Sequence, residues 1–295
     1  MNDCIWLNGK IIPMSEARLG IEDRGFQFAD GVYEVLRLYD AKPFTIVEHL
    51  ARLERSAAGI ALAVPLRLET LANEIRKLIA ASGVRDGMVY LQLTRGQAPR
   101  NHIFPEHAEP TLLFYARPLP PPPLPGEGDG VRLLTVADER WHRCWIKSIA
   151  LLPNVLAKNQ AVAAGADEAV FVDRGMVSEC AASNLFAVIG PRLVTHPVGP
   201  RVLPGITRAV LLECAKELGI EVEQRPLREE EAVGASELFI TSTTREVSWV
   251  KRWNDREIGQ GRCGAATIAL HEALQRRVAA ECGSEMLRPV PAIAG

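Results

Sequence analysis

The sequence predicts a two-domain α/β protein, and three observations support this fold class. The chain has 295 residues, which exceeds the usual single-domain size of roughly 100 to 150 residues. Strand-like and helix-like spacings of apolar residues both occur along it. The segment LPPPPLPGEGDG at 119–130 can hold neither a helix nor a central strand, because its prolines and glycines disfavour both. We therefore expect a smaller N-terminal domain at 1–118, a linker at 119–130 and a larger C-terminal domain at 131–295.

The N-terminal domain is expected to combine a sheet with two helices. It starts with two short strands over 5–12, because Asn8-Gly9 supplies the positive φ angles of a tight hairpin turn. Apolar residues recur at helical spacing over 50–60 and again over 68–78, which predicts two amphipathic helices. Further strands are predicted at 88–94 and 111–116. The polar, turn-rich segment between those two strands, GQAPRNHIFPEHAEP, is a candidate functional loop.

The C-terminal domain is expected to contain a second sheet and at least two helices. Strands are predicted at 131–136, in a hairpin around 173–175, at 184–189, at 193–196 and on both sides of Asn254-Asp255. A helix is predicted from Ile206 to Gly219, since glycine suits the left-handed position just past a helix end. A last helix is predicted near 267–280.

Composition and charge exclude several classes of partner. The formal net charge is -2 and no basic run is present, so nucleic acid is a poor candidate partner. The N-terminal segment lacks the pattern of a signal peptide, and no apolar stretch approaches the roughly 18 residues that suggest a membrane span. Six cysteines are scattered without a CxxC pair, which favours buried, reduced thiols over disulfides or a zinc site. We therefore expect a soluble, cytoplasmic protein without a bound metal.

Lys147 is a candidate catalytic nucleophile. It lies in CWIKSIALL, where apolar residues flank it on both sides. If the segment is buried, the charged form of the lysine is disfavoured. A neutral amine can form a Schiff base with an aldehyde cofactor and later transfer a proton. The alternative from this segment alone is a lysine at a strand end whose ammonium extends into water.

Three further segments carry groups that could hold such a cofactor. Glu179 in SECAASN could keep a pyridine nitrogen protonated, or it could lie at a hairpin edge in water. Gly205 in LPGITRAV precedes a helix start whose amides could bind a phosphate, although many helices begin in this way without a ligand. The hydroxyl run 242–244 in FITSTTREV could add donors or form an ordinary turn. The sequence contains none of the usual signatures of nucleotide-binding, metallopeptidase or hydrolase sites.

Taken together and in order, these segments resemble the fold-type IV, or class IV, family of pyridoxal-phosphate enzymes. The family includes branched-chain aminotransferases, D-amino-acid aminotransferases and aminodeoxychorismate lyase. The resemblance extends from EDRGFQFADGVYEVLR at 22–37, through EHLARLERSA, to FITSTTREV, and so covers nearly the whole chain. It implies a small N-terminal α/β domain and a larger C-terminal α/β pseudo-barrel domain, with pyridoxal 5′-phosphate in the cleft between them.

The resemblance also implies a role for each candidate cofactor-binding residue. Lys147 would form the Schiff base, and Glu179 would pair with the pyridine nitrogen. Arg52 in EHLARL corresponds to the phosphate-binding arginine of the family, and Leu203 would lie against the face of the ring. The other phosphate contacts would come from a helix start and a hydroxyl-rich turn, namely from Ile206, Thr207, Ser242 and Thr243.

The segment RGQAPRNHIFP is similar to the RxH loop of D-amino-acid aminotransferases. Arg100 and His102 would then bind the substrate carboxylate, for which a guanidinium offers a planar fork. Tyr33 of GVYE would work with them, and Thr244 would also contact the substrate. Because this loop reaches into the partner subunit's site in those relatives, the resemblance implies a homodimer.

The sequence departs from the family pattern near two of these residues. Trp145 stands two positions before Lys147, where a smaller polar residue is common. Ala181 and Ala182 follow Glu179 and Cys180 in place of the usual small hydroxyl residues. Fewer hydroxyl contacts to the cofactor are therefore expected.

We therefore predict a pyridoxal-phosphate-dependent transaminase that acts by a ping-pong mechanism. It would move the amino group of a D-amino acid such as D-alanine to a 2-oxo acid such as 2-oxoglutarate. The alternatives are a branched-chain L-amino-acid aminotransferase, an aminodeoxychorismate lyase and a pyridoxal-phosphate carrier that has lost turnover. Arg100 and His102 favour the D-amino-acid enzyme among these.

Overall fold

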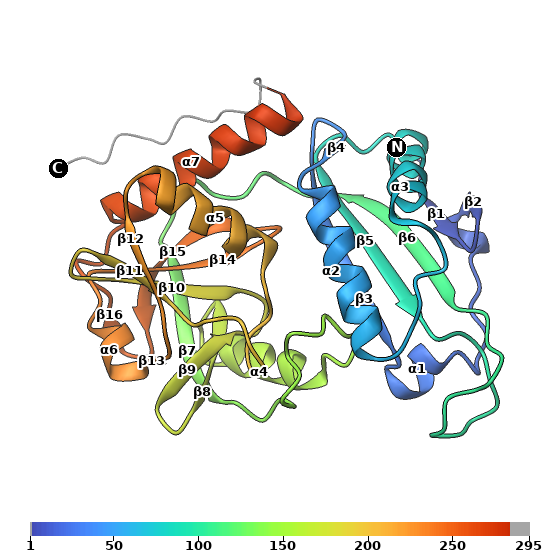
Figure 1. Cartoon of the computed structure of the whole chain (residues 1–295). Helices are drawn as coiled ribbons and strands as arrows, with labels where there is room; N and C mark the ends of the chain where they lie inside the picture. The colour runs from blue at the N-terminus through green and yellow to red at the C-terminus, as the bar shows by residue number, and fades with distance from the viewer. Residues whose placement is uncertain (1, 284–295) are drawn as a thin grey trace. The chain divides into compact units, whose positions relative to one another are not determined.

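The computed structural model describes residues 2–283, which form two compact units (Figure 1). The first unit runs to Pro121 and also contains Ile146–Leu151. The second unit consists of Pro122–Trp145 and, within the described residues, of 152–283. The units therefore do not follow chain order, because one short segment after the proline-rich stretch belongs to the first unit.

The first unit is built on a six-stranded antiparallel sheet in the order β2-β1-β6-β5-β3-β4. Its strands are β1 (Cys4–Leu7), β2 (Lys10–Pro13), β3 (Gly31–Tyr39), β4 (Lys42–Pro43), β5 (Gly87–Thr94) and β6 (Thr111–Pro118). Its helices are η1 (Met14–Glu16), α1 (Arg24–Phe28), α2 (Ile46–Gly59) and α3 (Leu68–Ser82). Helix α2 packs against β3, and α3 packs against β1 and β6. The amphipathic pattern explains this arrangement, because Leu53, Ala57 and Leu71 are all buried.

The hairpin predicted at Asn8-Gly9 is present, with β1 paired to β2 in the register Leu7 opposite Lys10. Both turn residues have positive φ, 44° at Asn8 and 94° at Gly9. That conformation is the one that a tight hairpin turn requires.

The segment Ile146–Leu151 extends the first unit beside β3. Tyr33 donates its backbone N–H to the Lys147 carbonyl at 2.9 Å, and Ile149 donates to the Gly31 carbonyl at 3.1 Å. Val32 and Ser148 form an antiparallel bridge between these two hydrogen bonds. These bonds account for the position of this segment in the first unit.

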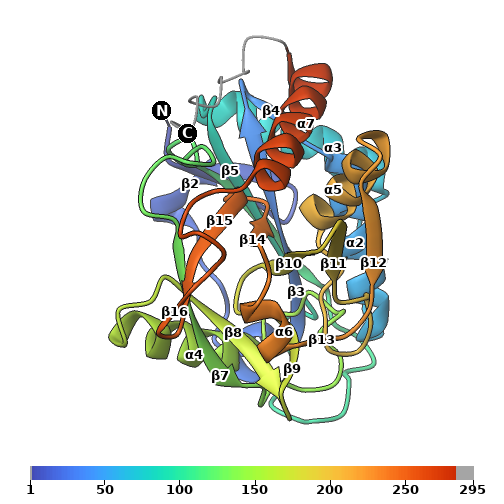
Figure 2. The same cartoon turned by 90° about the vertical axis from the view of Figure 1, so that its left-hand side faces the viewer.

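In the second unit, the described residues form one sheet of ten strands, in the order β12-β11-β10-β14-β15-β7-β8-β9-β13, with β16 paired to β15. The strands are β7 (Val131–Ala137), β8 (Glu168–Asp173), β9 (Met176–Cys180), β10 (Asn184–Ile189), β11 (Arg192–Thr195), β12 (Glu221–Gln224), β13 (Leu227–Arg228), β14 (Glu237–Ser242), β15 (Glu246–Trp253) and β16 (Arg256–Glu257). The helices are α4 (Leu152–Ala163), α5 (Ile206–Glu217), α6 (Glu229–Val233) and α7 (Ala265–Cys282). Helices α5 and α7 pack against each other and against β14, as Figures 1 and 2 show.

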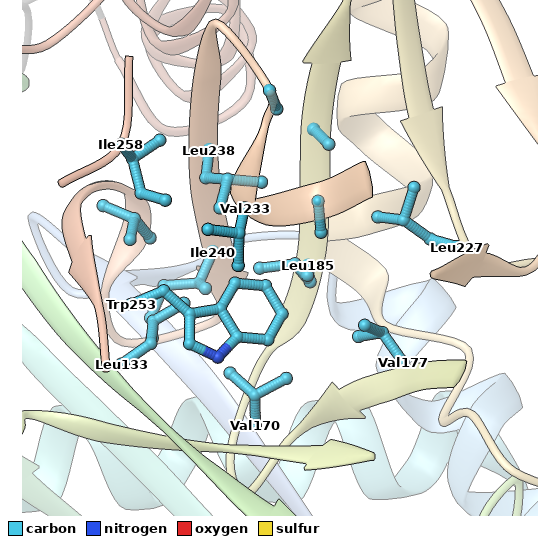
Figure 3. Packing of buried hydrophobic residues seen from close by; sticks show 14 of the residues in the cluster. Leu133, Val170, Val177, Leu185, Leu227, Val233, Leu238, Ile240, Trp253 and Ile258 are labelled. Carbon is cyan, nitrogen blue, oxygen red and sulfur yellow. The ribbon is translucent and has the colours of Figure 1, made fainter. Parts of the chain in front are cut away.

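The core of the second unit surrounds the indole of Trp253 (Figure 3). This side chain is fully buried among aliphatic residues that include Leu133, Val170 and Ile240. Its Nε1–H donates to Thr135 Oγ1 at 2.8 Å. A buried indole needs such a partner, because an unpaired N–H in a core is costly.

Two of the longer elements were not predicted from the sequence. Strand β3 was missed because buried charged residues, Glu34 and Arg37, interrupt its apolar pattern. Helix α4 was missed because Leu152 and Leu156 are exposed while Ala157 and Ala161 face the core. Its hydrophobic residues therefore do not mark its buried face.

Two expectations from composition can be compared with the structure. All six cysteines are free thiols with buried side chains, as predicted. Among the described residues, no helix is both long enough and apolar enough to span a membrane.

Candidate active site

Lys147 is anchored on both sides by main-chain hydrogen bonds in the first unit. Its carbonyl accepts from Tyr33, and its own N–H donates to Ser56 Oγ at 3.1 Å. Its Nζ atom lies 4.2 Å from the centroid of the Tyr33 ring, within the range of a cation–π contact. The lysine is only partly exposed. Strand β3 and helix α2 together therefore fix the position of its amine.

A buried charge cluster lies between β3 and α2. Glu34 is completely buried, and its two carboxylate oxygens accept from Arg52 Nε at 2.7 Å and Nη2 at 2.8 Å. His49 Nδ1 lies 2.7 Å from Glu34 Oε2. His49 and Arg52 are three residues apart on α2, so both reach the same carboxylate. Burial opposes the charge on Glu34, but Arg52 and then His49 outweigh it and hold the pKa of Glu34 well below its ordinary value.

Arg100 and His102 meet on the ring of Phe28. The Arg100 guanidinium lies 4.4 Å from the Phe28 ring centroid, and the His102 ring centroid lies 5.5 Å from it. Both side chains are otherwise exposed. Arg24, one turn before Phe28 on α1, donates to the Asn101 carbonyl at 2.5 Å. The loop therefore brings an arginine and a histidine to the same aromatic ring, and α1 supports the loop.

Glu179 is the centre of a polar cluster in the second unit. It lies near the end of β9, is 5% exposed and accepts from Arg140 Nη1 at 2.6 Å through Oε1. Its Oε2 accepts from Asn184 Nδ2 at 3.1 Å and from the Leu203 N–H at 3.0 Å. Burial raises the pKa of Glu179 to about 7, and the Arg140 guanidinium and the Leu203 N–H oppose this shift. The sequence alternative of a solvated hairpin-edge glutamate is therefore wrong.

The start of α5 lies beside this carboxylate. Asn184 Nδ2 also donates to the Leu203 carbonyl at 3.0 Å, so Asn184 ties Glu179 to the residues that precede the helix. Gly205 is the N-cap of α5, and a Cβ there would lie 2.0 Å from Asn184 Oδ1. Ile206 and Thr207 then occupy the first turn, whose amides have no acceptor within the helix.

The hydroxyl-rich run lies in the turn between β14 and β15. Ser242 Oγ accepts from the Arg245 N–H at 3.3 Å, while Thr243 and Thr244 are half-buried in the turn. Glu246 begins β15, and its carboxylate is hydrogen-bonded to Gln275 of α7. Helix α5 packs against β14, so the helix and the strand that leads into this turn are neighbours in the second unit.

The structure divides the predicted site residues into two groups. Those of the first unit are Tyr33, Arg52, Arg100, His102 and Lys147. Those of the second unit are Glu179, Leu203, Ile206, Thr207, Ser242, Thr243 and Thr244.

Sequence reasoning missed the residues that hold these groups in place. Glu34 could have been suspected, since His49 and Arg52 share one helix face and need a buried counter-charge. Arg140 carries no such signal, because nothing in DERWHRC distinguishes it from Arg143. Only the fold shows that Arg140 is buried while Arg143 is exposed.

Comparison with known proteins identifies the family. The family model for amino-transferase class IV matches residues 31–253, which is most of the chain. This chain belongs to the class IV aminotransferases. The family and the fold-type IV architecture predicted from the sequence are thus confirmed.

Two relatives of this class IV aminotransferase are D-alanine aminotransferases. The one from Bacillus licheniformis is 39% identical over 277 residues, covering 94% of this chain and 98% of the relative. The one from Staphylococcus haemolyticus is 38% identical, covering 93% of this chain and 97% of the relative.

Solved structures with the same fold include branched-chain amino acid aminotransferases. That of Escherichia coli has a TM-score of 0.84 and 27% identity, covering 93% of each chain. That of the archaeon Thermoproteus uzoniensis, with norvaline, has a TM-score of 0.83 and 26% identity, covering 98% of this chain and 99% of that one. A third, with pyridoxamine 5′-phosphate, has a TM-score of 0.87 and 28% identity, covering 96% of this chain and 95% of that one.

Proposed function

We propose that this aminotransferase binds pyridoxal 5′-phosphate and transfers the amino group of a D-amino acid, such as D-alanine, to a 2-oxo acid such as 2-oxoglutarate. The similarity to the D-alanine aminotransferases, which extends over nearly the whole chain, carries this proposal. The Arg100–His102 pair supports it, since the two side chains are presented together on Phe28 and suit a carboxylate.

The residues present fit the cofactor. Glu179 is a buried carboxylate whose Oε1 accepts one hydrogen bond from the described residues, which leaves it able to accept another from a protonated ring nitrogen. Gly205 leaves no Cβ in front of α5, and the amides of the first turn suit a dianionic phosphate. We assign phosphate binding to these amides, to the Ser242–Thr243 turn and to the positive charge of Arg52. We assign contact with the face of the cofactor ring to Leu203.

The bound cofactor supplies an aldehyde for an amine and a ring that accepts the electron pair released at the substrate's α-carbon. Lys147 Nζ would provide the amine that holds the cofactor, and as a free amine it would take the proton from the substrate's α-carbon and deliver it in the transamination step. Glu179 holds a proton on the ring nitrogen. Arg100, His102 and Tyr33 bind the substrate carboxylate, and Thr244 lies against the substrate. The first substrate would give up its amino group and leave as a 2-oxo acid, and a second 2-oxo acid would then take up that amino group, which makes the mechanism ping-pong.

We further propose a homodimer as the active form. Apolar side chains on and near α1 and the candidate loop are open to solvent in the single chain, among them Phe26 at 80% and Ile103 at 75% exposure. Patches of this kind mark interaction surfaces, and a second copy of the chain would cover them. Analytical ultracentrifugation is expected to give twice the mass of the chain, and a monomer at micromolar concentration would contradict this. The free, buried thiols support a reducing compartment such as the cytoplasm.

The absorption spectrum of the purified protein tests the proposal directly. With pyridoxal phosphate supplied, we expect a visible band from the lysine-bound cofactor that collapses when D-alanine is added and remains with L-leucine. Collapse with L-leucine alone would establish the branched-chain alternative, which the structural similarity to branched-chain enzymes makes the second candidate. The absence of any band would overturn the cofactor assignment.

A further inference from the structure

Arg140 has no role in the chemistry described above, yet it occupies the centre of the polar cluster around Glu179. It lies just after β7 and is only 7% exposed. Its Nη1 donates to Glu179 Oε1 at 2.6 Å, while its Nε and Nη2 donate to the two oxygens of Asp138 at 2.9 and 3.0 Å. One guanidinium therefore bridges two buried carboxylates.

Further contacts fix the plane and direction of this guanidinium. Nη2 also donates to Ser178 Oγ at 3.1 Å and to the Arg201 carbonyl at 3.0 Å. The ring centroid of Phe171 lies 4.1 Å from Arg140 Cζ. Because these contacts hold the planar guanidinium of Arg140 along all its edges, it cannot turn away from Glu179. Its Nη1 is therefore directed at one carboxylate oxygen of Glu179.

The same contact controls the charge of Glu179. Burial raises the pKa of Glu179 to about 7, and Arg140 is the main group that opposes the rise, whereas Asp138 adds to it. Burial also opposes the charge on Asp138, but Arg140 and then Ser178 outweigh it and lower the pKa of Asp138, which stays ionised. Without Arg140, two buried carboxylates would face each other without the cation between them.

The other ionisable groups around Glu179 do not replace Arg140. Arg208 of α5 is buried and interacts with Glu179, and its guanidinium donates to the His196 carbonyl and Gln224. Cys144 and Cys180 also interact with Glu179, and burial raises the pKa of both thiols, so they stay neutral at pH 7. Among the described residues, Arg140 is thus the cation that is hydrogen-bonded to Glu179.

We propose that Arg140 is the positioning residue that favours the ionised form of Glu179 and aims it at the ring nitrogen of the cofactor, an inference that rests on the proposed function. As a carboxylate, Glu179 accepts a hydrogen bond and holds a proton on the ring nitrogen. As a carboxylic acid, it donates a hydrogen bond and leaves the ring uncharged, which weakens the ring as an electron acceptor. Arg140 selects the first state without touching substrate or cofactor.

The decisive measurement is the titration of Glu179 in the cofactor-free protein. Protein labelled with ¹³C at the glutamate side-chain carboxyl is titrated by NMR, and the Glu179 signal is assigned by its loss in Glu179→Gln. We expect Arg140→Gln to raise the midpoint of Glu179 by about one pH unit or more. A midpoint equal to that of the wild type would overturn the proposal.

Two further variants make the test specific. Arg201→Gln removes a neighbouring cation that pairs with Asp138 and Asp173 but not with Glu179, and we expect a midpoint within about half a unit of the wild type. Arg140→Lys keeps the charge but cannot hold both carboxylates in one fork. We expect its midpoint to lie between those of the wild type and Arg140→Gln. If Arg140→Gln does not fold, an Arg140→Lys midpoint equal to the wild type overturns the proposal.

Cofactor affinity gives a second readout that a structural defect would not reproduce. We expect Arg140→Gln to bind pyridoxal phosphate several-fold more weakly than the wild type near about pH 7, with the ratio approaching one above about pH 9 as Glu179 ionises. A ratio that stays constant with pH would show that Arg140 acts only on stability and would overturn the proposal. Because neither readout uses an amino acid, a wild type that fails to transaminate D-alanine would overturn the proposed function separately.

Discussion

Arg52 and Glu34 form a forked ion pair in the interior of the first unit, with Nε–Oε1 and Nη2–Oε2 distances of 2.7 and 2.8 Å. The Glu34 carboxylate is inaccessible to solvent, and His49 contacts the same carboxylate. Tyr33 precedes Glu34 on β3, and successive side chains of a strand point to opposite faces. The Tyr33 ring therefore lies on the other face of β3, where it contacts Lys147 Nζ. The ion pair therefore fixes the strand that positions Lys147, the proposed catalytic lysine.

Replacing Glu34 by glutamine is expected to destabilise the protein by about 3–5 kcal/mol. Breaking a buried ion pair leaves Arg52 without its counter-charge, and this costs far more than the loss of a surface pair. Chemical denaturation monitored by fluorescence measures the change. Glu221→Gln is the matched control, since Glu221 forms an exposed pair with Arg192, and we expect a cost below about 1 kcal/mol. Equal costs for the two variants would contradict the prediction.

Glu34 should also make the stability depend on pH. Its folded-state pKa lies below the unfolded value, so the stabilisation is present above the ordinary pKa of glutamate and is lost as the pH falls below it. We expect the wild type to lose stability steeply from about pH 5 to pH 3, and Glu34→Gln to show a shallower loss. Melting temperatures across this range provide the measurement. If the melting temperatures of the wild type and of Glu34→Gln fall in parallel as the pH is lowered, another carboxylate dominates acid unfolding.

Lys147→Ala is expected to lower kcat by about 10⁴-fold or more, because the variant lacks both the amine nucleophile and the proton carrier. The visible band of the lysine-bound cofactor should be absent as well. Lys77→Ala, which removes an exposed lysine, is the control and should keep both the band and the activity. Near-normal turnover by Lys147→Ala would exclude the mechanism proposed here.

Arg100→Ala is expected to lower kcat/KM for D-alanine by roughly 10- to 100-fold, the range for a charge-assisted hydrogen bond to a carboxylate. The decisive comparison uses D-alaninamide, which keeps the amine and the chirality but has no carboxylate. Wild type and variant should differ little with that substrate. A similar loss with both substrates would mean that Arg100 supports the loop on Phe28 and does not bind the carboxylate.

The sequence was most informative where one or two residues decide the local backbone conformation. Asn8-Gly9 determines its hairpin turn, and Gly219 adopts the left-handed φ of 69° expected just past the end of α5. The charged residues of the site could not be placed in this way. Glu34 lies on β3, whereas its partners lie on α2, and no local pattern links the two elements.

The cluster around Glu179 shows the same limit more strongly. Arg140 is 39 residues from Glu179 and meets it because β7, β8 and β9 pair in the fold. Leu203 is 24 residues from Glu179 and meets it from the segment before α5. Sequence resemblance could point to Glu179 itself. The groups that set its charge depend on long-range contacts, which the spacing of residues does not reveal.

Gly205→Ala tests whether the close contact before α5 matters for cofactor binding. An added Cβ would meet Asn184 Oδ1 at 2.0 Å, so Asn184 must move and weaken its hydrogen bond to Glu179. We expect the affinity for pyridoxal phosphate to fall by roughly tenfold, as estimated from the loss of about one hydrogen bond. Gly199→Ala is the matched control, because a Cβ there meets nothing within 4 Å. Fluorescence titration of the cofactor-free proteins measures both, and equal affinities would show that Asn184 accommodates the methyl group without releasing Glu179.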